Sequence, residues 1–275
     1  MSVLSDTAND CCGVTIMEKD ILLSRGNLEI PCKQTVPDDG EIRRLVLGVH
    51  GLCGRADEQI QTGIAEEMEM FYAATFRFDF PAHGESPMDC DAFTVANCME
   101  SLLAVARYAR EQYPEVEDLC IFATGFGAYV TLTAMQDLIE LDCRVKLVIQ
   151  TPSLRMDQTV LNITRVSAVT LEAMEMVLFK APQRALGFFY SFYEECRDNP
   201  AFASYPIPML ILHGQHDDYI PMADIQLLRD LNDRSKLVII PGASHQFLEP
   251  GAWDMVLDLT RDWFEFEQVL LTEAH

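Results

Sequence analysis

The stretch 120–130 constrains the fold of this chain more than any other. It begins with an apolar run, Cys120-Ile121-Phe122-Ala123, which ends abruptly. Thr124-Gly125-Phe126-Gly127 follows, and a helix-like apolar pattern begins there. Small residues allow the chain to reverse direction sharply, because glycine tolerates backbone angles that other residues avoid. The stretch therefore predicts a buried strand, a tight turn and a helix, which together are the basic unit of an α/β fold.

Apolar runs and helix-like segments alternate along most of the rest of the chain. Strands are predicted at 14–23, 27–35, 43–49, 75–80, 118–123, 145–150, 209–213 and 237–240. Helices are predicted at 58–72, 93–113, 126–141, 222–231 and 252–271. Short connections between alternating strands and helices are typical of a parallel, doubly wound sheet. We expect an α/β core made of residues 1–150 and 206–275, with residues 1–13 as a frayed lead-in.

The alternation breaks between residues 151 and 205. This segment is rich in Met, Leu and aromatic residues and shows helical patterns without a clear strand. We expect a helical cap insertion at 151–205. Its apolar residues either line a ligand pocket or form the insertion's own core, since Met fills irregular gaps in cores.

Composition limits the partners of the chain. Its 275 residues include 43 acidic and 20 basic ones, giving a net charge of −23. Nucleic acids and anionic membranes require basic patches, so neither is an expected partner. Residues 1–10 lack the pattern of a signal peptide, and no apolar run is long enough for a membrane span. The nine cysteines show no C-x-x-C spacing. We therefore expect reduced thiols in a cytoplasmic protein, with no metal and no cofactor.

Three further motifs each follow a predicted strand. They are His50-Gly51-Leu52, His213-Gly214-Gln215-His216-Asp217 and Gly242-Ala243-Ser244-His245. With the turn at 123–127, they resemble the α/β-hydrolase fold family, in its branch of serine esterases, monoacylglycerol lipases and serine-aminopeptidase-like enzymes. The strand at 76–80 and the following His83-Gly84-Glu85-Ser86 resemble bacterial cinnamoyl (feruloyl) esterases. The resemblance implies a mostly parallel eight-stranded sheet flanked by helices, with a cap.

The resemblance also implies a catalytic triad in the chain order nucleophile, acid, histidine. The matching positions are Gly125, Asp217 and His245, with Asp218 as the neighbouring competitor for the acid. His245 would act as general base, because imidazole accepts and returns protons near neutral pH. Asp217 would orient His245 and stabilise its cation.

Other site residues follow from the same resemblance. The backbone N–H groups of Leu52 and Phe126 would form an oxyanion hole, which stabilises charge on a carbonyl oxygen. His50 and Gly51 would contribute to substrate binding, together with residues of the 151–205 insertion. We expect His50 to form hydrogen bonds within its own loop and not to act as a base.

Gly125 stands where the family places its nucleophilic serine. Glycine suits the strained turn but has no side chain that could attack a substrate. One hypothesis is that serine is the natural residue here and that Gly125 was engineered in to trap a substrate or product. The enzyme would then be a carboxylic-ester hydrolase that favours hydroxycinnamoyl or other small acyl esters. The retained Asp217 and His245 favour this hypothesis. The alternatives are a natural pseudoenzyme that binds a ligand, or an amide or peptide hydrolase with the same triad. Related esterases are often homodimers, so a dimer is a further expectation.

Overall fold

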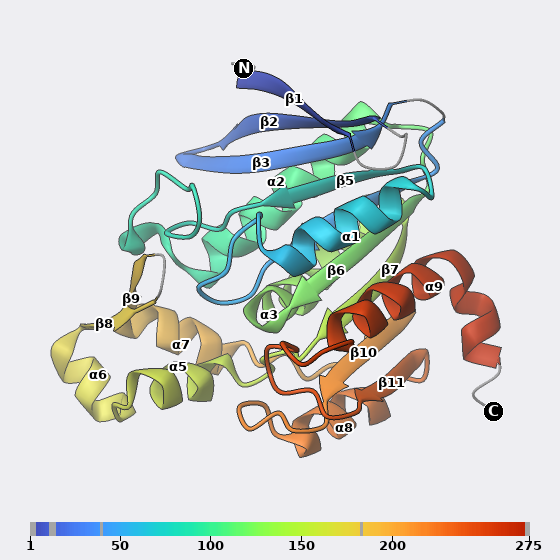
Figure 1. Cartoon of the computed structure of the whole chain (residues 1–275). Coiled ribbons are helices and arrows are strands. Elements are labelled where there is room, and N and C mark those ends of the chain that lie inside the picture. The colour runs from blue at the N-terminus through green and yellow to red at the C-terminus, as the bar shows by residue number, and fades with distance from the viewer. Residues whose placement is uncertain (1–3, 11–14, 39–40, 182–183, 273–275) are drawn as a thin grey trace.

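The computed structural model describes residues 4–10, 15–38, 41–181 and 184–272 (Figure 1). Nine described strands form the main sheet in the order β1-β2-β3-β5-β4-β6-β7-β10-β11. The pairs from β5–β4 to β10–β11 are parallel, and the pairs among β1, β2, β3 and β5 are antiparallel. The strands are β1 (Leu4–Asp10), β2 (Thr15–Arg25), β3 (Leu28–Pro37), β4 (Arg44–Val49), β5 (Ala73–Phe78), β6 (Asp118–Thr124), β7 (Arg144–Gln150), β10 (Met209–Gly214) and β11 (Ser235–Ile240).

The predicted α/β fold with a mostly parallel sheet is confirmed. Strands β2–β7, β10 and β11 are the eight expected strands, and β1 adds a ninth at the antiparallel edge. The expectation of an unstructured lead-in is wrong for residues 4–10, which pair with β2. Their polar sequence carries no apolar alternation that would have indicated a strand.

Two apolar cores lie on opposite faces of the sheet. Strand β6 serves both, since Leu119, Ile121 and Ala123 join one core while Cys120 and Phe122 join the other. Helices α1 (Gln59–Glu69) and α9 (Ala252–Thr272) cover the second face, and α2 (Val95–Gln112), α3 (Gly125–Thr133), α4 (Met135–Ile139) and α8 (Met222–Asp230) cover the first. Burial on both faces explains why the central strands read as continuous apolar runs.

The insertion between β7 and β10 contains helices α5 (Met156–Thr164), α6 (Ala168–Met174) and α7 (Tyr190–Asp198). It also contains an antiparallel hairpin of β8 (Met176–Lys180) and β9 (Ala185–Phe189), which the sequence analysis did not predict. Figure 1 shows this segment beside the end of the molecule where α3 begins. The expectation of an all-helical insertion is therefore wrong at the hairpin.

Candidate active site

The turn between β6 and α3 has the geometry that its sequence predicts. Gly125 has φ +47°, a left-handed angle that glycine adopts at little cost. A Cβ on Gly125 would meet only the Cα of Gly51, 4.0 Å away. A Cβ on Gly127, in contrast, would lie 2.4 Å from the carbonyl oxygen of His50. The glycine at 127 is required for packing, whereas position 125 has room for a side chain.

Asp217 and His245 follow the adjacent parallel strands β10 and β11, so both lie at the carboxyl edge of the sheet, as Gly125 does. Their loops approach closely at Gly214, where a Cβ would lie 2.6 Å from the carbonyl oxygens of Ala243 and Ser244. Residues separated by 28 positions in the chain are thereby brought into contact.

The structure brings His245 to Asp217 and leaves Asp218 exposed. Nδ1 of His245 donates to Oδ2 of Asp217 over 2.9 Å, while Oδ1 accepts the backbone N–H groups of Tyr219 and Ile220. Burial alone would raise the pKa of Asp217, but the hydrogen bonds from His245 and from the backbone lower it overall. An ionised Asp217 holds the proton on Nδ1 of His245 and leaves Nε2 as the free basic nitrogen.

Leu52 and Phe126, the expected oxyanion donors, lie on the two segments that flank position 125. Phe126 is the second residue of α3, and the first N–H groups of a helix have no intrahelical partner. Leu52 directly follows Gly51, the residue nearest to a side chain at 125. Two backbone N–H groups in these positions are suited to stabilising an oxyanion near position 125.

The His50 side chain holds its loop and is not available to substrate. Its ring is 1% exposed, Nδ1 donates to the carbonyl oxygen of Gly51 over 2.8 Å, and Nε2 accepts the N–H of Phe80 over 3.1 Å. Burial lowers the pKa of His50 to about 4, so the ring is neutral. The expectation that His50 contacts substrate is therefore corrected, since backbone groups use both of its nitrogens.

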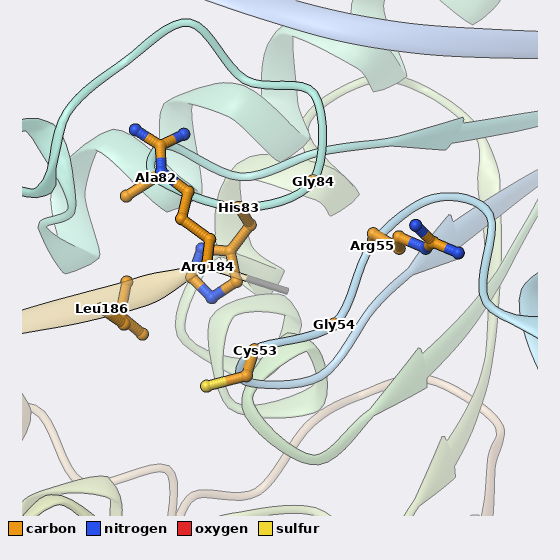
Figure 2. Close-up of a pocket in the computed structure, with 8 residues that line it drawn as sticks. All are labelled: Cys53, Gly54, Arg55, Ala82, His83, Gly84, Arg184 and Leu186. Carbon is orange, nitrogen blue, oxygen red and sulfur yellow. The ribbon is translucent and has the colours of Figure 1, made fainter. Parts of the chain in front are cut away.

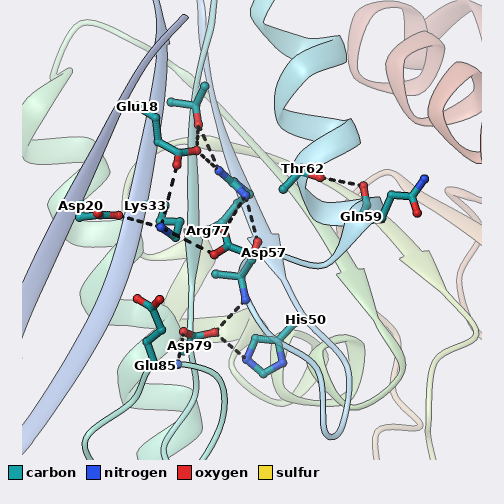
Figure 3. A network of polar contacts seen from close by, with 12 residues as sticks. Glu18, Asp20, Lys33, His50, Asp57, Gln59, Thr62, Arg77, Asp79 and Glu85 are labelled. Carbon is teal, nitrogen blue, oxygen red and sulfur yellow. Dashed lines mark hydrogen bonds and ion pairs between the residues drawn. The ribbon is translucent and has the colours of Figure 1, made fainter. Parts of the chain in front are cut away.

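A charged network beside the loop after β4 was not anticipated from the sequence (Figure 3). The Asp79 carboxylate accepts the N–H of Ala56 over 2.7 Å and the N–H of Glu85 over 2.8 Å. Gly84 packs so tightly against it that a Cβ would lie 2.3 Å from its carboxyl carbon. Arg77 donates to the carbonyl oxygen of Ala56 over 3.0 Å. Asp79 thus joins the loop after β4 to the turn after β5, which keeps the expected oxyanion donors in place.

The insertion packs directly on the turn at Gly125. The N–H of Ser153 donates to the Gly125 carbonyl oxygen over 3.1 Å. Phe192 stacks on Phe93 with ring centroids 4.6 Å apart and lies 6.0 Å from Phe126. Phe192 is only 1% exposed, so this aromatic residue of the insertion belongs to a core. The sequence left open whether apolar residues of the insertion line a pocket or form a core, and Phe192 is a core residue.

Tyr219 is a residue near the site that the sequence analysis did not single out. Its ring centroid lies 5.1 Å from that of His245, and 69% of the residue is exposed. An exposed aromatic ring beside the histidine offers an apolar surface to a ligand at this edge of the sheet. The sequence feature that could have identified Tyr219 is its position two residues after Asp217.

Within the ranges that the structure describes, no group of three or more His, Cys, Asp or Glu residues is arranged to hold a metal ion. None of the described helices combines the length and apolar character needed to cross a membrane. The seven described cysteines are free thiols, and Cys11 and Cys12 lie outside the described residues.

Solved structures similar to this chain share its fold. Est1E from Butyrivibrio proteoclasticus with bound ferulic acid has a TM-score of 0.78 and 18% identity, covering 90% of this chain and 99% of that one. The esterase domain of a Rhodothermus marinus protein has a TM-score of 0.66 and 16% identity, covering 91% and 99%. Mouse alpha/beta hydrolase domain-containing protein 10 has a TM-score of 0.70 and 16% identity, covering 90% and 98%. No family model and no curated protein matches the sequence. The chain has the α/β-hydrolase fold.

Proposed function

We propose that this chain carries the site of a serine carboxylic-ester hydrolase without its nucleophile, and that it binds a small ester or acid without covalent turnover. The observation that carries the proposal is the Asp217–His245 hydrogen bond of 2.9 Å at the sheet edge where Gly125 also lies. A buried carboxylate that fixes the tautomer of an adjacent histidine is the arrangement that general-base catalysis requires.

With serine at position 125, the reaction would be acyl transfer to water. Nε2 of His245 would take the hydroxyl proton as the oxygen attacks the ester carbonyl, and would then return it to the leaving alcohol. The N–H groups of Leu52 and Phe126 would stabilise the tetrahedral oxyanion. Water activated by His245 would release the acid. Removing the serine from such a triad lowers kcat by about 10⁶-fold, so the chain with Gly125 is expected to be inactive.

We propose hydroxycinnamoyl or other small acyl esters as the ligand class. The likeness to Est1E, which was solved with ferulic acid, supports this choice. In this proposal residues 151–205 act as a cap that covers the bound ligand. A natural binding protein is the second candidate, favoured by Gly125 itself, because glycine fits the turn without strain.

The test is to restore the missing hydroxyl with Gly125→Ser. Short-chain p-nitrophenyl esters and hydroxycinnamate esters would be assayed with stopped-flow detection of an acylation burst. We expect a burst followed by steady turnover in Gly125→Ser and neither in the chain with Gly125. Gly125→Ala is the matched control for filling the space, and His245→Ala in the Gly125→Ser background is the control for the base. The proposal fails if Gly125→Ser hydrolyses no ester, amide or monoacylglycerol.

A further inference from the structure

Two buried histidines have a ring nitrogen without a hydrogen-bond partner among the described residues. One is His83, which lines a small pocket between the loop after β4, the turn after β5 and the start of β9 (Figure 2). The pocket walls are residues 53–55, 82–84, 184 and 186, a set that contains neither Asp217 nor His245. The other is His213, whose unpartnered nitrogen faces Asp217 itself.

The position of His213 is fixed by its strand. It lies on the same face of β10 as Met209 and Ile211, because successive strand residues point to opposite faces. Met209 and Ile211 belong to an apolar core, and His213 itself is only 1% exposed. The loop that carries Asp217 begins directly after β10, four residues further along the chain. The ring therefore lies between the core and the acid of the candidate site, away from solvent.

One carboxylate oxygen of Asp217 faces two imidazole rings. Nδ1 of His213 lies 3.8 Å from Oδ2 of Asp217, and Nδ1 of His245 lies 2.9 Å from the same atom. The other oxygen, Oδ1, accepts two backbone N–H groups. A carboxylate oxygen can accept two hydrogen bonds, so His245 leaves one acceptor position of Oδ2 for His213. The separation of 3.8 Å is longer than a hydrogen bond, but an N–H dipole acts on a charge over this distance in a buried site.

The Asp217 carboxylate determines which nitrogen of His213 carries the proton. Burial lowers the pKa of His213, Asp217 opposes this shift and His245 adds to it, so the ring is neutral at pH 7. Asp217 and His245 are the titratable groups that act on the ring, one from its own loop and one from the loop after β11. With the proton on Nε2, the Nδ1 lone pair would face an ionised oxygen in a buried site, which is unfavourable. With the proton on Nδ1, the positive end of the N–H points at that oxygen, so this tautomer is the more stable one.

The N–H of His213 alters the electrostatic field that His245 experiences. It stabilises the Asp217 anion, and its positive end lies near the imidazolium that would form at His245. A cation at His245 therefore gains less from Asp217 than it would beside an apolar residue at position 213. A general base must be unprotonated before it can take a proton from a hydroxyl group. The arrangement therefore favours the basic form of His245.

We infer that His213 is a positioning residue of this site: its Nδ1–H points at Oδ2 of Asp217 beside His245, and it lowers the affinity of His245 for a proton. The inference rests on the proposed function for the role of His245 as a base. It concerns a property of the ligand-free chain, however, and requires no turnover. The resemblance to esterases assigned no role to His213.

Nuclear magnetic resonance of the chain with Gly125 tests both parts of the inference. Two-bond ¹H–¹⁵N correlation of the histidine rings should show His213 as the Nδ1–H tautomer at pH 7. Titration of the His245 ring protons measures its proton affinity, which should rise about fivefold in His213→Leu because the N–H dipole is lost. His213→Asn is the matched control, since its amide N–H can occupy the position of Nδ1, and it should change this affinity less than about twofold.

The outcomes separate this inference from the proposed function. An Nε2–H tautomer of His213 in the unsubstituted chain overturns the inference, and this result does not depend on whether any variant folds. An unchanged proton affinity in His213→Leu overturns it as well. So does an equal rise in His213→Leu and His213→Asn, because loss of packing alone would produce that pattern. If Gly125→Ser hydrolyses nothing but the tautomer and the rise in His213→Leu are observed, the proposed function fails and the inference stands.

Discussion

The carboxylate of Asp217 lies 2.9 Å from Nδ1 of His245, and the same carboxylate accepts two backbone N–H groups from its own loop. The histidine is therefore oriented by a group that the loop itself fixes. Asp218 is next in the chain but exposed, and it makes no such contact among the described residues.

This difference predicts the effect of amide substitutions in the Gly125→Ser background. Asp217→Asn should lower kcat by about 10⁴-fold, because the histidine then adopts the wrong tautomer. Asp218→Asn is the matched control and should change kcat less than about twofold. Steady-state kinetics on one p-nitrophenyl ester is sufficient, and similar losses in the two variants would contradict the assignment.

The two glycines of the turn should respond differently to a methyl group. Gly125→Ala has room and should cost about 1–2 kcal/mol for the left-handed angle alone. Gly127→Ala places its Cβ 2.4 Å from the His50 carbonyl oxygen and should cost about 3 kcal/mol. Urea unfolding measures both, and equal costs would show that α3 does not approach the β4 loop so closely.

Asp79 should matter more to stability than its charged neighbour Asp57. Asp79→Asn loses an acceptor for one of two backbone N–H groups and should destabilise the fold by about 1–3 kcal/mol. Asp57 is 40% exposed and pairs with Arg77 at 3.4 Å, so Asp57→Asn should cost less than about 1 kcal/mol. Hydrogen exchange of the 50–57 loop should accelerate in Asp79→Asn alone. Unchanged hydrogen exchange of this loop in Asp79→Asn would show that Asp79 does not hold the loop in position.

The burial of Glu58 leads us to expect a specific pH dependence of stability. Burial raises the pKa of Glu58 from 4.5 to about 7. A raised pKa means that the native state holds this proton more tightly than the unfolded chain, so the stabilisation is complete below about pH 4.5 and is lost as pH rises to 7. The gain in unfolding free energy of Glu58→Gln over the unsubstituted chain should therefore be larger at pH 8 than at pH 5 by about 2 kcal/mol. An equal effect of Glu58→Gln at the two pH values would contradict the raised pKa of Glu58.

The contributions of His50 and His83 to stability change with pH in the opposite direction to that of Glu58. Burial lowers their pKa values to about 4 and about 3, so the unfolded chain binds protons first as pH falls below 6.5. Their contribution to stability is complete above pH 6.5 and is lost on acidification towards these lower values. In Glu58→Gln, which removes the opposing contribution of Glu58, the protein should therefore unfold at lower urea concentration at pH 5 than at pH 7. A rise in stability from pH 7 to pH 5 in this variant would contradict the neutral state of both rings.

The central fold was predictable from sequence because strands buried on both faces are continuous apolar runs, as in β4 and β6. The pairing of Asp217 with His245 was predictable because each follows a parallel strand and such strand ends share one edge. The single helix expected at 126–141 is divided at Ala134 into α3 and α4, a local change that the apolar pattern does not encode.

The remaining features depend on contacts between distant segments. The hairpin β8–β9 was missed because its aromatic and Met residues fit a helical pattern equally well, and only pairing such as Met176 with Phe189 distinguishes the two. Asp79 and His83 received no role because nothing local shows that one joins two loops or that the other has an unpaired nitrogen.

The open space at Gly125 has a consequence for how such a chain changes over generations. A side chain there would find its nearest neighbour 4.0 Å away, so serine would clash with nothing in the turn and would meet only the cost of the left-handed backbone angle. Glycine and serine codons differ by one base in the GGU/AGU and GGC/AGC pairs. Under the proposed function, one base change at codon 125 would separate a ligand-binding protein from a hydrolase.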